Sequence, residues 1–464
     1  MGTTTRRALL RNSGLGLGWI GLQSLLAADS PSSSALTAKA PHFAPRAKRL
    51  IFLFMHGGPS SIDTFDPKPR LAIDHGKPLP IKRELTFGAD SVGGLMGSPW
   101  KFAQYGESGL PVSELFPHVA KRADDLCVIR SMVGDGVDHG AALLQMHTGM
   151  FSFKRPSMGS WMLYGLGTEN ANLPGYVTIK PTLGHGGANN WSSSFLPGEY
   201  QGTRVGDKGM NIDEIAEDPV PWLTRDDVST ENQRFELDML QAMNRRHAAA
   251  LDDTPALEAR IEALELAFRM QTEAPEAFEV EKESEATKKL YGMDEDITRD
   301  FAWQCLLARR LSERGVRIVQ CTNSYWDQHS QLVEKHTELA AQVDKPIAGL
   351  LADLKGRGLL DETLVIWGGE FGRSPWTQGK DGRDHNPYGF TIWMAGGGVK
   401  PGFVYGSTDE FGYHAVENRM HLHDFHATVL HLMGLDHERL TYRYGGRDFR
   451  LTDVAGVVHK GIFS

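Results

Sequence analysis

The apolar run RLIFLFM, residues 49–55, leads directly into HGGP, residues 56–59, and this junction decides the fold. A strand that is apolar on both faces is typical of a buried, parallel sheet. Two similar runs follow: VRIVQC at residues 316–321 and LVIW at residues 364–367. Sites in open α/β sheets lie beyond the carboxyl ends of the strands. The polar loops after these three runs are therefore where we expect a functional site.

The composition excludes several classes of protein. The chain has 464 residues, of which 41% are hydrophobic and 23% charged, as in soluble globular proteins. Its net charge is -9 and it has no basic stripe, which excludes nucleic acid as a partner. Cys127, Cys305 and Cys321 are too widely spaced for a disulfide framework or a Cys-based zinc ribbon, so we expect buried free thiols.

The N-terminus has the features of a twin-arginine export signal over residues 1–28. Arg6 and Arg7 precede a short apolar, Gly-rich run, and small residues suited to a signal peptidase follow it. An ordinary Sec signal or an uncleaved anchor is the alternative. We expect residues 29–48 to be a linker and the mature chain to be periplasmic or secreted, without a membrane span. Twin-arginine export carries folded proteins that often hold a metal, which favours a metal here.

Residues 49–464 are predicted to form one α/β domain. Between residues 230 and 271 the apolar residues change to helical spacing, which predicts a helical insertion at about residues 226–290 packed against that domain. Residues 423–433 predict an amphipathic helix that ends at Gly434.

Four segments carry candidate chemistry. His56 and Asp63 follow the first apolar run and suit a transition-metal site, although an Asp after a Gly-Pro turn is also typical of a helix cap. Asp327 and His329 alternate by two and can project to one side of an extended segment as a metal clip, or form a surface pair. His139 begins a segment that ends at Gly149, where a histidine at a helix start is more often structural.

The third apolar run leads into the richest segment. Two arginines, two carboxylates and a histidine lie within 16 residues: Glu370, Arg373, Arg383, Asp384 and His385. Arginine can hold a tetrahedral oxyanion with two hydrogen bonds, while carboxylates and imidazole bind cations. A salt-bridged loop without chemical function is the alternative.

Together these stretches resemble the family named domain of unknown function 1501, which is placed in the alkaline-phosphatase and sulfatase superfamily. The matching residues are 41–45, 56–69, 326–329, 369–375, 382–385 and 445–447. The resemblance implies a three-layer α/β/α sandwich with a mostly parallel central sheet, alkaline-phosphatase-like. It also implies a metal-dependent site at the strand ends that acts on phosphate or sulfate esters.

The resemblance also implies roles for single residues. Counted nine residues back from Thr148, His139 stands where the sulfatases have their nucleophile precursor. Glu370 can replace an aspartate ligand of the superfamily, but Phe371 cannot replace the histidine or asparagine ligand that follows it. Asp327 with His329 looks like the superfamily's Asp and His metal pair, and His385 looks like its last histidine ligand.

These observations lead to two hypotheses. The first is a sulfatase-like, metal-dependent hydrolase of phosphate or sulfate esters, small or glycan, in which His139, Arg373 and Arg383 are catalytic. A divalent metal, with zinc or manganese favoured and calcium as an alternative, would be held by residues drawn from His56, Asp63, Asp327, His329, Glu370, Asp384 and His385. The Gly-rich loop at residues 184–190 would line the pocket, or be a plain surface loop. The second hypothesis is a non-catalytic extracytoplasmic protein that binds an anionic sugar or a partner protein. A mutase or transferase using the same metals is not distinguished from these.

Overall fold

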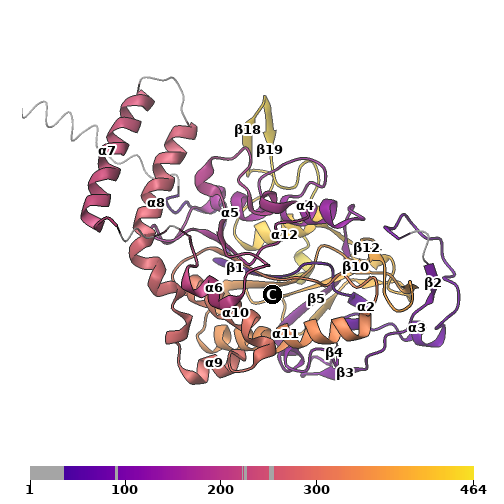
Figure 1. Cartoon of the computed structure of the whole chain (residues 1–464). Coiled ribbons are helices and arrows are strands. Elements are labelled where there is room, and N and C mark those ends of the chain that lie inside the picture. The colour runs from indigo at the N-terminus through magenta and orange to yellow at the C-terminus, as the bar shows by residue number, and fades with distance from the viewer. Residues whose placement is uncertain (1–35, 89–91, 222, 224–226, 250–254) are drawn as a thin grey trace, which may run out of the picture.

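The computed structural model describes residues 36–88, 92–221, 223, 227–249 and 255–464 (Figure 1). The predicted export signal, residues 1–28, and the first part of the predicted linker lie outside the described residues. Within the described residues, no helix is both long and apolar enough to cross a membrane. Cys127, Cys305 and Cys321 are free and buried, as predicted.

A nine-stranded sheet forms the centre of the domain. Its strands in chain order are β1 (Arg49–Met55), β5 (Leu126–Val133), β6 (Tyr176–Ile179), β7 (Thr203–Val205), β8 (Ile318–Asn323), β9 (Thr363–Gly368), β13 (Phe390–Ala395), β14 (Phe403–Tyr405) and β17 (Met420–His421). The spatial order is β14-β5-β13-β9-β1-β8-β6-β7, and β17 pairs with β5. Only β13 runs antiparallel to its neighbours, β5 and β9. The sheet is therefore mostly parallel, as predicted.

Helices cover both faces of the sheet. The helices of the described residues, not all of which lie on the sheet, are α2 (Ser61–Thr64), α3 (Pro69–Ile73), α4 (His139–Thr148), α5 (Met158–Leu166), α6 (Ile212–Glu217), α7 (Thr230–Ala249), α8 (Pro255–Phe278), α9 (Glu285–Tyr291), α10 (Asp296–Glu313), α11 (Leu332–Gly356) and α12 (Leu422–Leu432). Alternate residues of β1 show the layers. Ile51 and Leu53 pack in the core formed with α10 and α11, whereas Phe52 and Phe54 pack in the core formed with α4, α5 and α12. The predicted α/β/α sandwich is thus confirmed.

The three predicted strands lie side by side. β1 is the middle strand of the three and pairs in parallel with both β8 and β9, with Leu53 opposite Cys321 on one side and Trp367 on the other. The loops that begin after Met55, Asn323 and Gly368 therefore leave the same edge of the sheet. Because this edge gathers three segments far apart in sequence, it is where the candidate residues meet.

Short sheets organise the loops outside the central sheet. The pair that positions the site is β10 (Gly372–Arg373) with β12 (His385–Asn386), in which Arg373 lies opposite His385. This pairing folds the two halves of the Glu370–His385 segment onto one another. The other short strands are β2 (Val92–Leu95) with β11 (Trp376–Gln378), β3 (Phe102–Tyr105) with β4 (Leu110–Ser113), β15 (Ser407–Thr408) with β16 (Ala415–Glu417), and β18 (Tyr442–Tyr444) with β19 (Arg447–Phe449).

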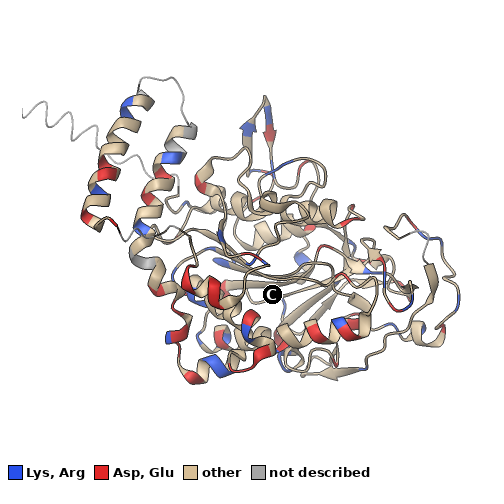
Figure 2. Ribbon diagram, in the orientation of Figure 1, with Lys and Arg blue, Asp and Glu red and all other residues tan. Residues whose placement is uncertain are grey.

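The helical segment after β7 projects from the body of the domain. α7 and α8 lie side by side as a hairpin, and both fall within the predicted insertion at residues 226–290 (Figure 1). The limits of the insertion and of the domain stay predictions. Figure 2 shows charged residues concentrated on the outer helices and few on the central strands, which is the distribution expected when the sheet lies between two helical layers.

A buried histidine of α11 fixes the loop after β1. His336 is fully buried, and its Nε2 accepts a hydrogen bond of 3.1 Å from the backbone N–H of Ser60. Its ring stacks on Trp100 and meets Trp326 edge-on. Burial lowers the pKa of His336 to about 3. The loops after β1 and β8 are thus held together by a histidine that must stay neutral.

This histidine makes stability dependent on pH. Its pKa is depressed in the folded protein, so its contribution is present above the unfolded pKa of 6.5 and is lost as the pH falls from 6.5 towards 3. The contribution lost by pH 5 is roughly 2 kcal/mol. His336→Gln keeps an acceptor for Ser60, and we expect it to flatten the pH profile of the unfolding free energy measured in urea between pH 4 and 8. The exposed His247→Gln is the control; a His336→Gln profile parallel to wild type would contradict this prediction.

Candidate metal centre

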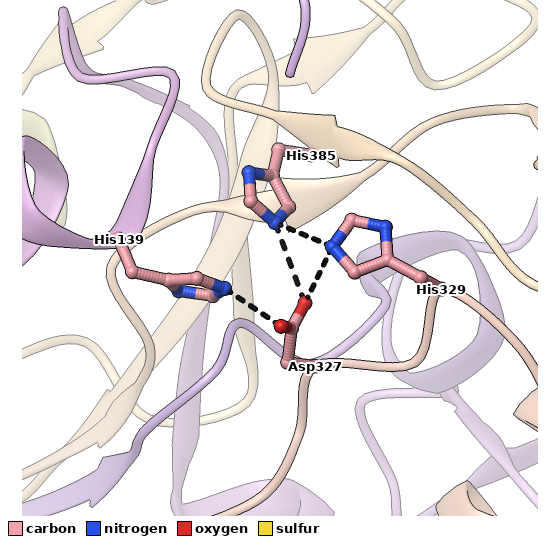
Figure 3. Close-up of side chains that lie close together, drawn as sticks. All are labelled: His139, Asp327, His329 and His385. Atoms are coloured by element: carbon pink, nitrogen blue, oxygen red, sulfur yellow. Dashed lines mark hydrogen bonds and ion pairs between the residues drawn. The ribbon is translucent and has the colours of Figure 1, made fainter. Parts of the chain in front are cut away.

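Four side chains converge at the carboxyl edge of the sheet: His139, Asp327, His329 and His385 (Figure 3). Their candidate ligand atoms all lie within 4.8 Å of one another. Asp327 Oδ1 is 2.9 Å from His329 Nε2 and 3.3 Å from His385 Nε2, and Asp327 Oδ2 is 3.1 Å from His139 Nε2. α4, the loop after β8 and strand β12 supply these residues. We call this group the His/Asp cluster.

Each imidazole of the cluster is oriented by an oxygen at its other nitrogen. His139 Nδ1 donates to Glu370 Oε1 at 2.7 Å, and His385 Nδ1 donates to the carbonyl of Val137 at 2.7 Å. His329 Nδ1 donates to Gln378 Oε1. Because these oxygens accept, each Nδ1 carries a proton, and each Nε2 faces into the cluster. Metal-binding histidines are held in this way by their surroundings.

The Nε2 atoms themselves fit a cation. Those of His329 and His385 lie 3.0 Å apart, so two lone pairs face each other unless a proton or a cation lies between them. His139 Nε2 is buried and has no partner in hydrogen-bonding geometry, although the Asp327 carboxylate is close. Three imidazole nitrogens and one carboxylate are a donor set suited to a divalent transition metal. The residues present therefore fit a metal ion.

Charge within the cluster is strongly coupled. Burial alone would raise the pKa of Asp327, but contacts with His139, His329 and His385, and the charge of Arg373, hold it well below its usual value. Burial alone would lower the pKa of His139, but Asp327 and Glu370 raise it to about 9. Burial lowers the pKa of His385 to about 4, so this ring is neutral at pH 7. An ionised carboxylate and at least one neutral imidazole are thus ready to act as ligands.

The Asp327 carboxylate is held by a buried guanidinium. Arg373 Nη2 donates to Asp327 Oδ1 at 2.8 Å, and Arg373 also donates to the backbone carbonyls of Gly57, Gly58 and Arg383. Gly57 has a φ of +116°, and a Cβ there would approach the backbone N of Asp327 to 2.7 Å. Only glycine lets the loop after β1 lie this close to the loop after β8.

Glu370 holds the other side of the cluster. It is fully buried, and its two carboxylate oxygens accept the N–H of Gly57 at 2.9 and 3.2 Å while Oε1 also accepts from His139. Burial alone would raise the pKa of Glu370, but the hydrogen bond and the charge of His139 lower it. Glu370 is therefore an ionised carboxylate that orients His139.

Two further histidines adjoin His139. His56 Nε2 lies 3.3 Å from His185 Nδ1, and the His185 ring stacks on His139 with centroids 5.1 Å apart. Burial lowers the pKa of His56 to about 4, so it is neutral. The Gly-rich loop at residues 184–190 thus reaches the site through His185, although this residue is exposed.

Comparison with known proteins assigns the chain to a family. The sequence model described as "Protein of unknown function (DUF1501)" matches residues 47–462. The chain belongs to this family. No curated protein matches it.

Several solved structures are similar to this DUF1501 chain. The lipoteichoic acid synthase LtaP from Listeria monocytogenes is 8% identical, with a TM-score of 0.37, over 90% of this chain and 78% of that protein. The alkaline phosphatase of the Antarctic bacterium TAB5 is 12% identical, with a TM-score of 0.32, over 84% of this chain and 99% of that protein. The PsFucS1 sulfatase from Pseudoalteromonas sp. is 13% identical, with a TM-score of 0.33, over 84% of this chain and 68% of that protein.

The DUF1501 chain places three of the expected residues away from the cluster. Asp63 pairs with Arg383, whose Nε donates to Asp63 Oδ2 at 2.7 Å, and both side chains are fully buried. Arg383 also donates to the carbonyls of Ser374 and Met96. The Asp384 carboxylate accepts the backbone N–H groups of Gly88 and His385. These residues shape the loops around the cluster.

Other residues at the site were not expected from the sequence. Gln378 orients His329, and Phe87 stacks on His385 with centroids 5.1 Å apart. Phe371, which the sequence indicated to be unable to replace a ligand, also stacks on His385, with centroids 4.3 Å apart. Gln378 lies between the two halves of the Glu370–His385 segment. This position is the only feature of the sequence that could have indicated its role at the site.

Metal uptake tests the cluster directly. We expect wild-type protein to bind about one equivalent of zinc or manganese, and Asp327→Asn and His385→Ala to lose it, because each removes a ligand between oriented partners. Elemental mass spectrometry and thermal melting with added metal measure this; a metal at 100 times its Kd stabilises a protein by about 2.7 kcal/mol.

Matched variants control this experiment. Asp361→Asn and His247→Ala make the same chemical changes at exposed positions and should retain the metal. Full metal content in Asp327→Asn would refute the assignment of the cluster.

The buried ion pair beneath the site makes a separate prediction about stability. Asp63→Asn leaves the Arg383 guanidinium buried without a counter-charge, so we expect a loss of about 3–5 kcal/mol in the free energy of unfolding. The double variant Asp63→Asn/Arg383→Gln should recover part of it. Glu362→Gln breaks the half-exposed pair with Lys48 and should cost about 0–1 kcal/mol. Equal losses in Asp63→Asn and Glu362→Gln, measured by urea denaturation, would contradict this account.

Proposed function

We propose that this protein is a metal-dependent hydrolase of phosphate or sulfate esters. The observation that carries the proposal is the His/Asp cluster, in which three imidazoles have Nδ1 bonded to an oxygen and Nε2 directed at one carboxylate. Such orientation has little use in an ordinary surface cluster and matches the requirements of a metal site.

Asp327, His329 and His385 are the proposed ligands. Both histidine Nε2 atoms approach the same carboxylate oxygen, Asp327 Oδ1, so one ion can contact all three side chains. A divalent cation held there supplies Lewis-acid activation of the ester and of the attacking water. The mixed imidazole and carboxylate set favours zinc or manganese, with calcium as the alternative.

His139 is the proposed general acid and base. Its Nε2 lies beside Asp327 Oδ2, at the edge of the ligand group, and Glu370 fixes the ring from the opposite side. As water bonds to the phosphorus or sulfur atom, the bond from that atom to the leaving oxygen breaks, and His139 gives this oxygen its proton. The ring recovers a proton from the attacking water. No hydroxyl or thiol nucleophile is needed in this scheme.

Arg373 and Arg383 act as positioning residues in this proposal. Both guanidiniums are buried, and their N–H groups are taken by carboxylates and backbone carbonyls. Arg373 fixes the orientation of Asp327, and Arg383 holds the loop after β1 through Asp63. Substrate charge is then met by the cation and by His139.

The proposed setting is the periplasm or the cell exterior, reached by the twin-arginine route with the metal already bound. The pair Arg6 and Arg7 ahead of a short apolar run supports this. The alternative function is a non-catalytic binding protein for an anionic sugar or a partner protein. It is favoured by one observation: Phe371 packs on His385 where a relative of the superfamily would have a further ligand.

Turnover of generic esters separates the two functions. We expect metal-loaded protein to hydrolyse 4-nitrophenyl phosphate or 4-nitrophenyl sulfate, and His139→Ala to lower kcat by about 10²–10⁴ while it keeps its metal, because general acid–base catalysis contributes that much. Rates are measured with zinc, manganese, calcium and magnesium, beside elemental analysis of each sample.

The outcomes distinguish the residue roles as well. His414→Ala, outside the cluster, is the control and should match wild type. Loss of metal in His139→Ala would make His139 a fourth ligand. Full occupancy without turnover of either ester would reject the hydrolase and favour the binding protein.

A further inference from the structure

A cavity of about 950 Å³ is lined in part by Ser324 and Tyr325, which precede the cluster residue Asp327 in the loop after β8. It is lined by the residues that follow β6 and β7, by the carboxyl end of β8, and by the first turns of α10 and α11. It thus lies beyond the same edge of the sheet as the cluster. Its volume is at the upper end of the ~300–1,000 Å³ typical of sites for small molecules. It is far larger than a phosphate or sulfate group requires.

Three lysines line the cavity, and two of them form ion pairs with carboxylates of the protein. Lys180 pairs with Asp300 at 2.5 Å, and Lys335 pairs with Glu338 at 3.0 Å. Within the part of the chain that the structure describes, no carboxylate lies within ion-pair distance of Lys208. Its ammonium instead lies 5.1 Å from the centroid of the Tyr325 ring. Lys208 is therefore the cation in the cavity that can receive an anionic group.

Tyr325 has the properties of a contact surface for a ligand. Its φ is +82°, a left-handed conformation that costs a non-glycine residue free energy, and its side chain is 64% exposed. Folding has no need of an exposed aromatic ring in a strained conformation. The neighbouring Ser324 also lines the cavity, and its Oγ is buried without a hydrogen-bond partner. An aromatic face beside an unused hydroxyl suits a polyhydroxylated ring.

Tyr325 connects the Lys208 side of the cavity to the loop that carries the cluster residue Asp327. Tyr325 precedes the cluster residue Asp327 by two positions. Burial is the main cause of the lowered pKa of His185, and the charge of Lys208 adds to this lowering. The His185 ring stacks on His139. A molecule whose ester group lies at the cluster can therefore extend past Lys208 into the cavity.

We propose that this cavity binds the non-reacting part of a carbohydrate ester that carries a second sulfate or phosphate group. Tyr325 stacks on a sugar ring, and Lys208 pairs with the second anionic group. Hydroxyls are met by Ser324 and by the carboxylate of Asp296, which lines the cavity and accepts hydrogen bonds. Because the other lysines are already paired, one additional anionic group is recognised and a highly charged polymer is not. This inference deepens the proposed function and rests on it.

Binding to metal-free protein tests the cavity separately from catalysis. The probes are three versions of one disaccharide, with two, one or no sulfate groups, together with the doubly phosphorylated disaccharide, titrated calorimetrically into EDTA-treated protein. Lys208→Gln should weaken binding of the doubly charged probes about tenfold, as expected for one charge-assisted hydrogen bond, and leave the uncharged probe unchanged. Comparison of the affinities for the doubly sulfated and the doubly phosphorylated disaccharide shows which of the two anionic groups the cavity prefers.

Two variants make the result specific. Lys335→Gln changes a lysine of the same cavity that is already paired, and it should bind all probes as wild type does. Tyr325→Gly relieves the positive φ and removes the ring, so it should weaken binding of every probe without loss of thermal stability. Unchanged affinity in Lys208→Gln, or equal losses in Lys208→Gln and Lys335→Gln, would overturn the inference.

The proposed function fails by a different measurement. If wild-type protein shows no turnover of aryl esters with any metal while the effect of Lys208→Gln on binding persists, the hydrolase is rejected and the cavity stands as a sugar-binding site. If turnover is present and Lys208 has no effect on binding, this inference alone is rejected.

Discussion

The buried guanidinium of Arg373 is the interaction on which the geometry of the site depends. It binds Asp327 and the backbone carbonyls of Gly57, Gly58 and Arg383, so it joins the loops that follow β1, β8 and β9. A cation taken out of water costs several kcal/mol unless it is fully paired. If the three loops separated, the Arg373 guanidinium would lose its partners or become exposed to water. Adjacent parallel strands make the arrangement feasible because all three loops leave the sheet at one edge.

This use of Arg373 decides which groups remain for substrate. Both arginines of the Glu370–His385 segment already form ion pairs within the protein. Arg373 pairs with Asp327, and Arg383 pairs with Asp63. A tetrahedral oxyanion arriving at the cluster meets no free guanidinium from them. In the proposed hydrolase this charge would be balanced by a bound cation and by His139, while Lys208 would be left for a second anionic group.

The sequence predicted the architecture, and it placed Asp327, His329 and His385 at one edge of the sheet, because both depend on local pattern. Continuous apolar runs identified β1, β8 and β9, and the rule that sites lie beyond parallel strands led to Asp327, His329 and His385. The partner of Asp63 could not be predicted in this way. Asp63 lies on the same loop as His56, but it is part of the short helix α2 and is buried, where it forms an ion pair with Arg383.

Long-range contacts set the remaining limits of sequence interpretation. Gln378 orients His329 across 49 positions, and Lys180 is neutralised by Asp300 across 120. Neither contact can be predicted from residue spacing or hydrophobic periodicity in the sequence, because each depends on how distant segments pack together. The same holds for Lys208, whose importance lies in the lack of a carboxylate near it among the described residues.

The surroundings of Glu370 bear on how many cations the site can hold. A second ion beside the first would need Glu370 as a ligand, but both its oxygens accept the N–H of Gly57 and one also holds His139. Releasing Glu370 would leave a buried N–H unsatisfied, at a cost of about 1–3 kcal/mol, and would free His139 to rotate. Phe371, stacked on His385, fills the adjacent space with an apolar ring. These contacts favour one ion in the proposed site, with Asp327, His329 and His385 as its proposed ligands, while Glu370 orients His139.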